Sequence, residues 1–118
     1  MRVGFVPHDW LFARAACVVH HGGAGTVAAT LRAGVPSIVV WHLGDQPVWG
    51  RILERHGVAP RAIAHTRLSA ERLGEALTRV LSEDGFSQRA RQLAGNLGQE
   101  EGVITAVRAI EDAAKPRA

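Results

Sequence analysis

Residues 20–26 read His-His-Gly-Gly-Ala-Gly-Thr, and this stretch decides the fold of the chain. An apolar run over 15–19 precedes it and a run with helical spacing follows, so we predict a strand that turns through glycines straight into a helix. Such a turn brings free backbone N–H groups to the positive end of the helix dipole, where they attract an anion. Gly23 and Gly25 leave room for a phosphate, and Thr26 offers a hydroxyl as a further donor.

Two adjacent histidines end the predicted strand. Neighbouring side chains of a strand point to opposite faces, so we expect one of the pair to reach the ligand, and His21 beside the turn is the better candidate. The loop has no Lys and is not a GxxxxGK[ST] phosphate loop, so His21 would supply the missing donor or positive charge. His20 is more simply interpreted as a structural residue. A zinc site of His20, His21 and His42 is disfavoured because adjacent strand histidines diverge, and we expect no metal.

Strand and helix patterns alternate along the chain, which is typical of a parallel sheet with crossover helices. We predict strands over 2–6, 17–20 and 37–40 and one more short strand within 58–63. We predict helices from an N-cap at Asp9 to 12, over 26–33 with Gly34 as its stop, and over 47–56 with Gly57 past its end. A further helix follows the N-cap Ser69, and its predicted buried face consists of Leu73, Ala76, Leu77, Val80 and Leu81. Two more are predicted around 86–97 and 103–110.

The predicted fold class is therefore α/β, a Rossmann-like parallel sheet with flanking helices. A chain of 118 residues can bury one core, so we expect one domain over 1–114 and a frayed tail over 115–118. The arginines are scattered along the chain without interleaved aromatics, so we predict no nucleic-acid surface despite the net charge of +3. The single Cys17, in an apolar run, fits a reducing compartment. We see neither a signal peptide nor a run of membrane-spanning length, and we expect a cytoplasmic protein.

A second polar group, Asp45-Gln46, follows the predicted strand 37–40. In an open α/β sheet this loop overhangs the same crevice as the glycine turn, and a carboxylate beside an amide suits neighbouring sugar hydroxyls. Asp45 is alternatively the cap of the helix that follows. Residues 23–28 also fit GxGxxA with Asp45 about 20 residues on, which leaves a nicotinamide-dependent dehydrogenase as an alternative. Against it, Asp45 lies in a loop and does not end the strand.

Four blocks in order carry a resemblance to a known family: residues 6–12 (Val-Pro-His-Asp-Trp-Leu-Phe), 20–26, 33–36 (Ala-Gly-Val-Pro), and 44–47 (Gly-Asp-Gln-Pro) with Trp49-Gly50. They resemble the C-terminal, donor-binding domain of glycosyltransferases of the GT-B fold that use nucleoside-diphosphate sugars, in particular the bacterial natural-product and sterol glucosyltransferase-like branches. The resemblance implies transfer of a hexose, from a UDP-linked donor, to a hydroxyl of a lipid, sterol or natural product with inversion. It implies no obligatory cofactor.

The resemblance also assigns roles to individual residues. His21 would contact the donor diphosphate, and Gly25 and Thr26 would bind phosphate, while Asp45 and Gln46 would hold the sugar. Phe5, Val6 and His8 would surround the base and ribose. Ala29 stands where many plant relatives carry a ribose-binding Glu, so ribose contacts must come from elsewhere. The catalytic base and the acceptor pocket would belong to an N-terminal domain, so we expect this chain alone to be inactive.

The first strands of the resembled sheet are missing from the predicted set. The strand 2–6 would be the third of about six, without its usual neighbour, so we expect a re-paired sheet edge, a homodimer or a domain swap. Three readings remain open: half of an enzyme, either cut from a longer chain or a subunit of a split transferase; a non-catalytic binding remnant; and the dehydrogenase fragment. Neither the donor sugar nor the acceptor can be read from the sequence.

Overall fold

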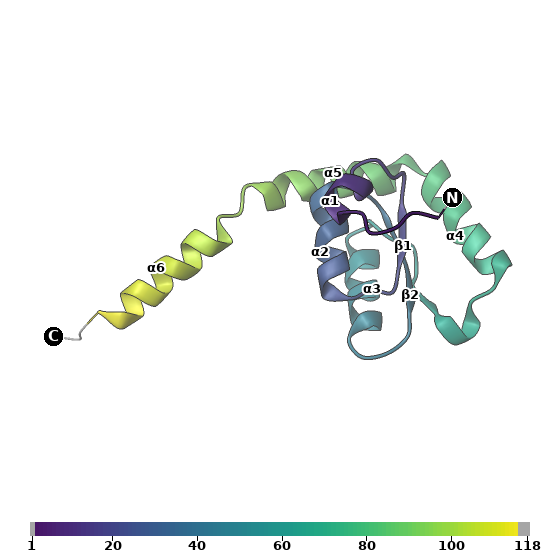
Figure 1. The fold of residues 1–118 in the computed structure, drawn as a ribbon. Helices are drawn as coiled ribbons and strands as arrows, with labels where there is room; N and C mark the ends of the chain where they lie inside the picture. The colour runs from purple at the N-terminus through teal and green to yellow at the C-terminus, as the bar shows by residue number, and fades with distance from the viewer. Residues whose placement is uncertain (1, 116–118) are drawn as a thin grey trace.

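The computed structural model describes residues 2–115 and has a three-stranded parallel sheet at its centre (Figure 1). The strands are β1 (Val18–His20), β2 (Ser37–Trp41) and β3 (Ile63–Ala64), in the spatial order β1-β2-β3. Val19 of β1 is in register with Ile38 of β2, and Trp41 of β2 with Ala64 of β3. The predicted α/β class with a parallel sheet is confirmed.

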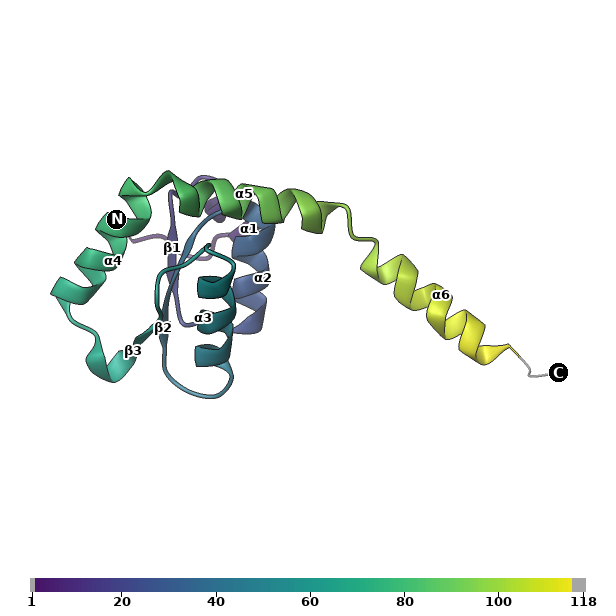
Figure 2. The ribbon, with the colours of Figure 1, turned by 180° about the vertical axis from the view of Figure 1, so that it is seen from behind.

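Helices cover this sheet on both sides. They are α1 (His8–Phe12), α2 (Ala24–Ala33), α3 (Gln46–Arg55), the 3-10 helix η1 (His65–Arg67), α4 (Ala70–Ser82), α5 (Asp84–Gly98) and α6 (Gly102–Ala114). In both views α2 and α3 lie on one side of the strands and α4 on the other, while α5 packs against both α2 and α4 (Figures 1 and 2). No helix within residues 2–115 is both long and apolar enough to cross a membrane.

The central strand β2 is buried on both faces. Val39 packs with Val27 of α2 and Leu53 of α3 in one cluster. Ile38, one residue earlier, packs on the other face with Val80 of α4 and Phe86 of α5. Because both faces are covered, β2 is a continuous apolar run and does not alternate with polar residues.

Most predicted helix ends are confirmed. Gly34 ends α2 in the left-handed conformation, with φ +67° and its N–H donated to the carbonyl of Leu31. The Ser69 hydroxyl accepts a hydrogen bond from the backbone N–H of Arg72 at 3.2 Å and so caps α4. The predicted N-cap at Asp9 is wrong, because α1 begins at His8 and the Asp9 carboxylate binds the N–H of Trp10.

Leu81 is the one wrong member of the predicted buried face of α4. Its side chain is 57% exposed, whereas Val80 next to it is buried. Successive helix residues lie about 100° apart, so only one of the two can face the sheet at this last turn. The buried position goes to Val80, which contacts Ile38 and Phe86 in the core.

The predicted strand over residues 2–6 is wrong. These residues form no strand, and within the described chain β1 has β2 as its only neighbour. An extended segment becomes a strand only when another backbone pairs with it, and residues 2–6 do not pair with the open edge of β1. The chain therefore does not re-pair its own sheet edge, and a homodimer or domain swap stays a prediction.

The strand predicted within 58–63 is shorter than expected and begins only at Ile63. Val58 and Ala59 are buried but lie in a connecting turn, where the Val58 N–H donates to the carbonyl of Leu53 at 3.1 Å. Pro60 follows and has no N–H to give to a ladder. The apolar character of this run therefore reflects burial beneath α3 and α5, and its Val58 carbonyl also accepts a hydrogen bond from the N–H of Ser37 in β2 at 2.9 Å.

The last helix, α6, projects away from the sheet and its covering helices (Figures 1 and 2). Its apolar side chains Val103, Ile104, Val107 and Ile110 are all exposed, and the molecule measures 65 × 31 × 28 Å. The predicted helix is present. The predicted tail begins at Lys115, whose ammonium group lies 2.6 Å from the Asp112 carboxylate. Residues 116–118 of that tail lie outside the described residues.

Gly50 lets α3 pack closely against the segment before β3, and this contact can be tested. A Cβ at Gly50 would lie 2.6 Å from the Cβ of Ala62. We expect Gly50→Ala to lower the free energy of unfolding by about 1–2 kcal/mol, because overpacking outweighs the better helix propensity of Ala. Gly74→Ala in α4 is the control, since a Cβ placed there would have no atom within 4 Å apart from its chain neighbours and the nearby backbone of its own helix. It should raise stability slightly in urea unfolding, and equal behaviour of the two variants would contradict the packing argument.

Candidate functional site

The N-terminus of α2 has no cap of its own. Gly23 is the N-cap residue, no side chain accepts a hydrogen bond there, and the first turn carries no acidic residue. The N–H of Val27 donates to the carbonyl of Gly23 at 2.9 Å, whereas the N–H groups before it have no intrahelical acceptor. Thr26 places its hydroxyl in this first turn. The first turn of α2 thus presents free backbone N–H donors that suit an anion.

Gly22 joins this helix end to the end of β1 and touches the next loop. Its φ is +88°, a conformation that side-chain-bearing residues rarely adopt. A Cβ there would lie 2.9 Å from the Val39 side chain and 3.1 Å from the backbone carbonyl of Gln46. Any larger residue would therefore push the turn away from β2 and from the first residue of α3. The glycine turn and the Asp45-Gln46 loop lie side by side, as the sequence predicted.

His21 lies over the beginning of α2. Its side chain is exposed, and its Nε2 is the atom closest to the position that a Cβ on Gly23 would occupy. The imidazole therefore fills the space left by the missing side chain of Gly23, next to the uncapped N–H groups. That His21 reaches a ligand in preference to His20 stays a prediction.

His20 points to the other side and fastens the turn. Its Nδ1 accepts a hydrogen bond from the N–H of Gly22 at 3.0 Å. Its Nε2 is buried and has no hydrogen-bond partner among residues 2–115. Burial, and secondly the neighbouring His21, lower the pKa of His20 from 6.5 to about 4. His20 is therefore neutral at pH 7 and has a structural role.

The Asp45 carboxylate is oriented by the helix that it precedes. Asp45 is the N-cap residue of α3, but its side chain accepts no hydrogen bond from that helix's backbone. Instead its Oδ2 accepts a hydrogen bond from the indole N–H of Trp49 at 2.8 Å. Trp49 in turn packs against the core cluster around Val39. The second carboxylate oxygen, Oδ1, is free of such a bond within residues 2–115 and can accept from a ligand.

Gln46 is held in the same way by its own loop. Its Oε1 accepts the backbone N–H groups of His42 at 2.8 Å and Leu43 at 3.2 Å. Because both partners are donors, the amide oxygen must face them and the Nε2 group must face away. The loop therefore presents one fixed acceptor, on Asp45, and one fixed donor, on Gln46.

Phe5, Val6 and His8 lie together in the segment that leads into α1. They line a hollow of about 660 Å³ that also includes Ala29 of α2. Phe5 is fully exposed, whereas the His8 ring stacks on Phe12 with centroids 4.7 Å apart. Ala29 lies one helical turn beyond Thr26, so α2 connects this hollow to the uncapped helix end. The structure thus places one group of predicted residues at the start of α2 and the other beside the middle of the same helix.

His65 lies at the carboxyl ends of the parallel strands, and the sequence analysis did not single it out. It directly follows β3, and its ring stacks on that of His42 with centroids 4.6 Å apart and an angle of 9°. Its position after a strand of a parallel sheet was the available signal, because the carboxyl ends of parallel strands share one edge. No group of three or more His, Cys, Asp and Glu residues within 2–115 is placed to hold a metal ion.

Comparison with known proteins identifies the family. Residues 1–106 match the family described as the C-terminal domain of erythromycin biosynthesis protein CIII-like proteins. The chain belongs to this family. A sterol 3-beta-glucosyltransferase of Arabidopsis thaliana is 45% identical over 104 residues, which are 88% of this chain and 16% of that protein. An O-mycaminosyltylonolide 6-deoxyallosyltransferase of Streptomyces fradiae is 38% identical over 117 residues, which are 99% of this chain and 28% of that protein.

Solved structures agree with this family. The glycosyltransferase of kitacinnamycin superimposes with a TM-score of 0.82 at 29% identity, over 92% of this chain and 28% of that protein. The glycosyltransferase VinC, solved in complex with dTDP, gives a TM-score of 0.78 at 31% identity, over 93% and 29% of the two chains. The predicted resemblance to the C-terminal half of a GT-B glycosyltransferase is thus confirmed, and the dehydrogenase alternative is not favoured. The chain spans less than a third of each of these relatives.

The buried His20 makes a prediction about pH. Because its pKa in the folded protein is about 4, below the unfolded value of 6.5, the unfolded chain takes up a proton first as the pH falls. Stability is therefore complete above about pH 6.5 and declines toward pH 4, by an amount of the order of 1 kcal/mol once partial contact with water is discounted. His20→Asn keeps an acceptor at the position of Nδ1 for the Gly22 N–H but does not titrate. Urea unfolding at pH 7 and pH 4.5 should show a smaller loss for this variant, and equal losses would contradict the assignment.

Proposed function

We propose that the chain is the donor-binding part of a glycosyltransferase that moves a hexose from a nucleoside-diphosphate sugar to a hydroxyl of a sterol, lipid or natural product. The observation that carries this proposal is the uncapped N-terminus of α2, with the imidazole of His21 lying against Gly23 beside it. The family supports the same reading, since relatives with matching sequences are named as glycosyltransferases.

The proposed role of the helix end is to hold the diphosphate. Backbone N–H groups at Gly25 and Thr26, the Thr26 hydroxyl and the His21 imidazole would all donate toward one anion. In the reaction the acceptor hydroxyl attacks the anomeric carbon from the face opposite the diphosphate, the bond from that carbon to the diphosphate oxygen breaks, and the configuration inverts. The same donors would then stabilise the negative charge that develops on the leaving diphosphate.

The proposed role of the Asp45-Gln46 loop is to bind the sugar. Asp45 Oδ1 would accept a hydrogen bond from one hydroxyl, and Gln46 Nε2 would donate to the oxygen of a neighbouring one. Both side chains are already held by Trp49 and by the loop amides, so little ordering is required on binding. The contact of Gln46 with Gly22 supports a site in which sugar and diphosphate groups are adjacent.

The hollow around Phe5, Val6 and His8 is the proposed place of the nucleoside. Phe5 is fully exposed and offers an aromatic face to a base. We infer a pyrimidine nucleotide: the motif resemblance favours UDP, and one solved relative was obtained with dTDP. Ala29 adds no polar group for the ribose, so its hydroxyls would bind backbone or solvent.

A catalytic base and an acceptor pocket are not assigned to any residue of this chain. The solved relatives are more than three times as long, and we propose that an acceptor-binding N-terminal domain, on the same chain or on a partner, supplies both. The chain alone would then bind donor and transfer no sugar. Genomic sequence directly upstream distinguishes a longer chain from a separate partner subunit.

Binding of UDP tests the diphosphate site. We expect His21→Ala and Thr26→Ala each to weaken UDP binding by about 10-fold or more in calorimetric titration, because each removes a hydrogen bond to a charged group. His56→Ala is a matched control, since His56 is exposed at the far end of α3. Circular dichroism should show that all three variants are folded. Binding of NAD tighter than UDP, or equal effects of His21→Ala and His56→Ala, would contradict the proposal.

The difference between UDP and UDP-glucose tests the sugar contacts separately. We expect Asp45→Asn to weaken UDP-glucose binding by about 5-fold to 10-fold while UDP binding stays the same, because only the sugar contacts that carboxylate. Glu111→Gln, which removes a carboxylate from the projecting helix α6, should change neither affinity. If both nucleotides lose affinity equally in Asp45→Asn, the sugar does not lie at this loop.

A further inference from the structure

A second hollow lies at the opposite edge of the sheet from β1, between α3 and α4. Its volume is about 750 Å³, and its floor contains Ala62, Ile63 and Ala64, which include the strand β3. Figure 2 shows α3 and α4 on either side of the segment that carries β3. Within the described residues β3 pairs only with β2, so its outer edge has no strand beside it.

Arginines gather around this hollow although they are scattered in the sequence. Its lining includes Arg51, Arg61, Arg67, Arg72 and Arg79, and we call it the arginine hollow. They come from α3, from the segment before β3, from η1 and from α4. Two carboxylates, Glu54 and Glu75, line it as well, and Glu83 outside the lining pairs with Arg79, so five positive charges face three negative ones. Neither Glu54 nor Glu75 forms an ion pair with another residue within 2–115.

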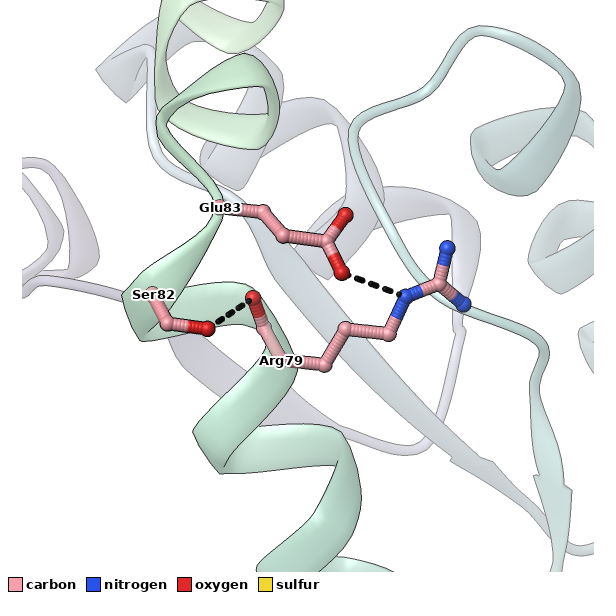
Figure 3. A network of polar contacts seen from close by, with 3 residues as sticks. All are labelled: Arg79, Ser82 and Glu83. Atoms are coloured by element: carbon pink, nitrogen blue, oxygen red, sulfur yellow. Dashed lines mark hydrogen bonds and ion pairs between the residues drawn. The ribbon is translucent and has the colours of Figure 1, made fainter.

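Two of these arginines are held in place by neighbouring groups. Figure 3 shows Arg79, whose Nε lies 3.0 Å from Glu83 Oε1, while its backbone carbonyl accepts a hydrogen bond from the Ser82 hydroxyl. The Arg79 guanidinium also lies 5.5 Å from the centroid of the Phe86 ring. Arg72 donates from Nη1 to the carbonyl of Arg67 at 3.3 Å. The side chains of Arg79 and Arg72, at the rim of the arginine hollow, are thus partly ordered before any ligand arrives. This lowers the conformational entropy lost on binding.

Three properties of the arginine hollow suit an extended chain better than a compact anion. The unpaired edge of β3 offers backbone donors and acceptors to another strand. The floor includes the apolar residues Trp41, Ile63 and Ala76, which would pack side chains of such a strand. The arginines around it would pair with carboxylates and repel a basic strand. A free phosphate would use the charges but neither the floor nor the strand edge.

We propose that the arginine hollow binds an acidic segment of another polypeptide, which pairs with the edge of β3 and directs its carboxylates to the rim. This site is separate from the proposed donor site, because none of the residues proposed to bind the donor lines the arginine hollow. The proposal therefore goes beyond the proposed function and assigns a protein partner to this face of the domain.

The test uses two fluorescein-labelled synthetic peptides, one alternating Glu and Val and one alternating Gln and Val. We expect the Glu peptide to bind the chain in fluorescence anisotropy, with an affinity that falls as salt is added, and the Gln peptide to bind at least roughly 10-fold more weakly. The double variant Arg51→Gln with Arg61→Gln should lose roughly 10-fold or more of the affinity for the Glu peptide. Arg2→Gln with Arg108→Gln removes the same charge outside the arginine hollow and should bind as the unmodified chain does.

Hydrogen exchange and a nucleotide titration complete the test. The amides of Ile63 and Ala64 should exchange more slowly with the Glu peptide bound, because a new strand covers the edge. Equal binding by the two double variants, or unchanged exchange at both amides, would overturn the proposal. Inorganic triphosphate serves as a competitor. If it displaces the labelled Glu peptide at a lower concentration than the unlabelled Glu peptide does, the proposal is overturned and the arginine hollow is a phosphate site. UDP titration of the Arg51→Gln with Arg61→Gln variant should match the unmodified chain, so this test is independent of the donor site.

Discussion

The proposed donor site depends on the close packing of two loops, which is possible because Gly22 has no side chain. The turn after β1 passes so close to Val39 and to the backbone of Gln46 that no Cβ fits, and its φ of +88° already favours glycine. This contact fixes the distance between two loops that are more than 20 residues apart in the chain. The start of α2, the His21 ring and the Asp45-Gln46 pair all take their positions from it. In the proposed function, the diphosphate and the sugar would therefore be bound by adjacent loops.

Local chemistry explains why much of this site was predictable. A glycine turn between a strand and a helix implies free N–H groups wherever it occurs, and alternation along a strand separates His20 from His21. The parallel order of the strands places the carboxyl ends of β1 and β2 on the same side of the sheet, which brings Gln46 next to the glycine turn. These inferences need only residue type, spacing and the rule that parallel strands end together. The helix ends at Gly34 and Ser69 were predictable for the same reason.

Features that depend on distant partners were not predictable. Residues 2–6 have the composition of a strand, but a strand needs a neighbour, and these residues do not pair with any of the described strands, including the open edge of β1. Val58 and Ala59 are apolar because α3 and α5 bury them, a reason that strand periodicity does not reveal. The arginines form no cluster in the sequence, because they belong to three helices and one connecting segment. Only the fold brings these parts together beside β3. The stacking of His42 on His65 likewise joins two loops that only the fold brings together.

The hydrogen bond between Trp49 and Asp45 links recognition to the interior of the domain. Trp49 holds the carboxylate proposed to read the sugar, and the same indole ring packs against the cluster of Val39, Leu53 and Val58. A substitution that shifts this cluster by a fraction of an ångström moves the indole and, with it, the carboxylate. Residues in contact are energetically coupled, so their effects on stability and on ligand choice do not add independently. A change of preference at the proposed donor site is therefore expected to alter buried apolar positions together with the polar residues proposed to touch the sugar.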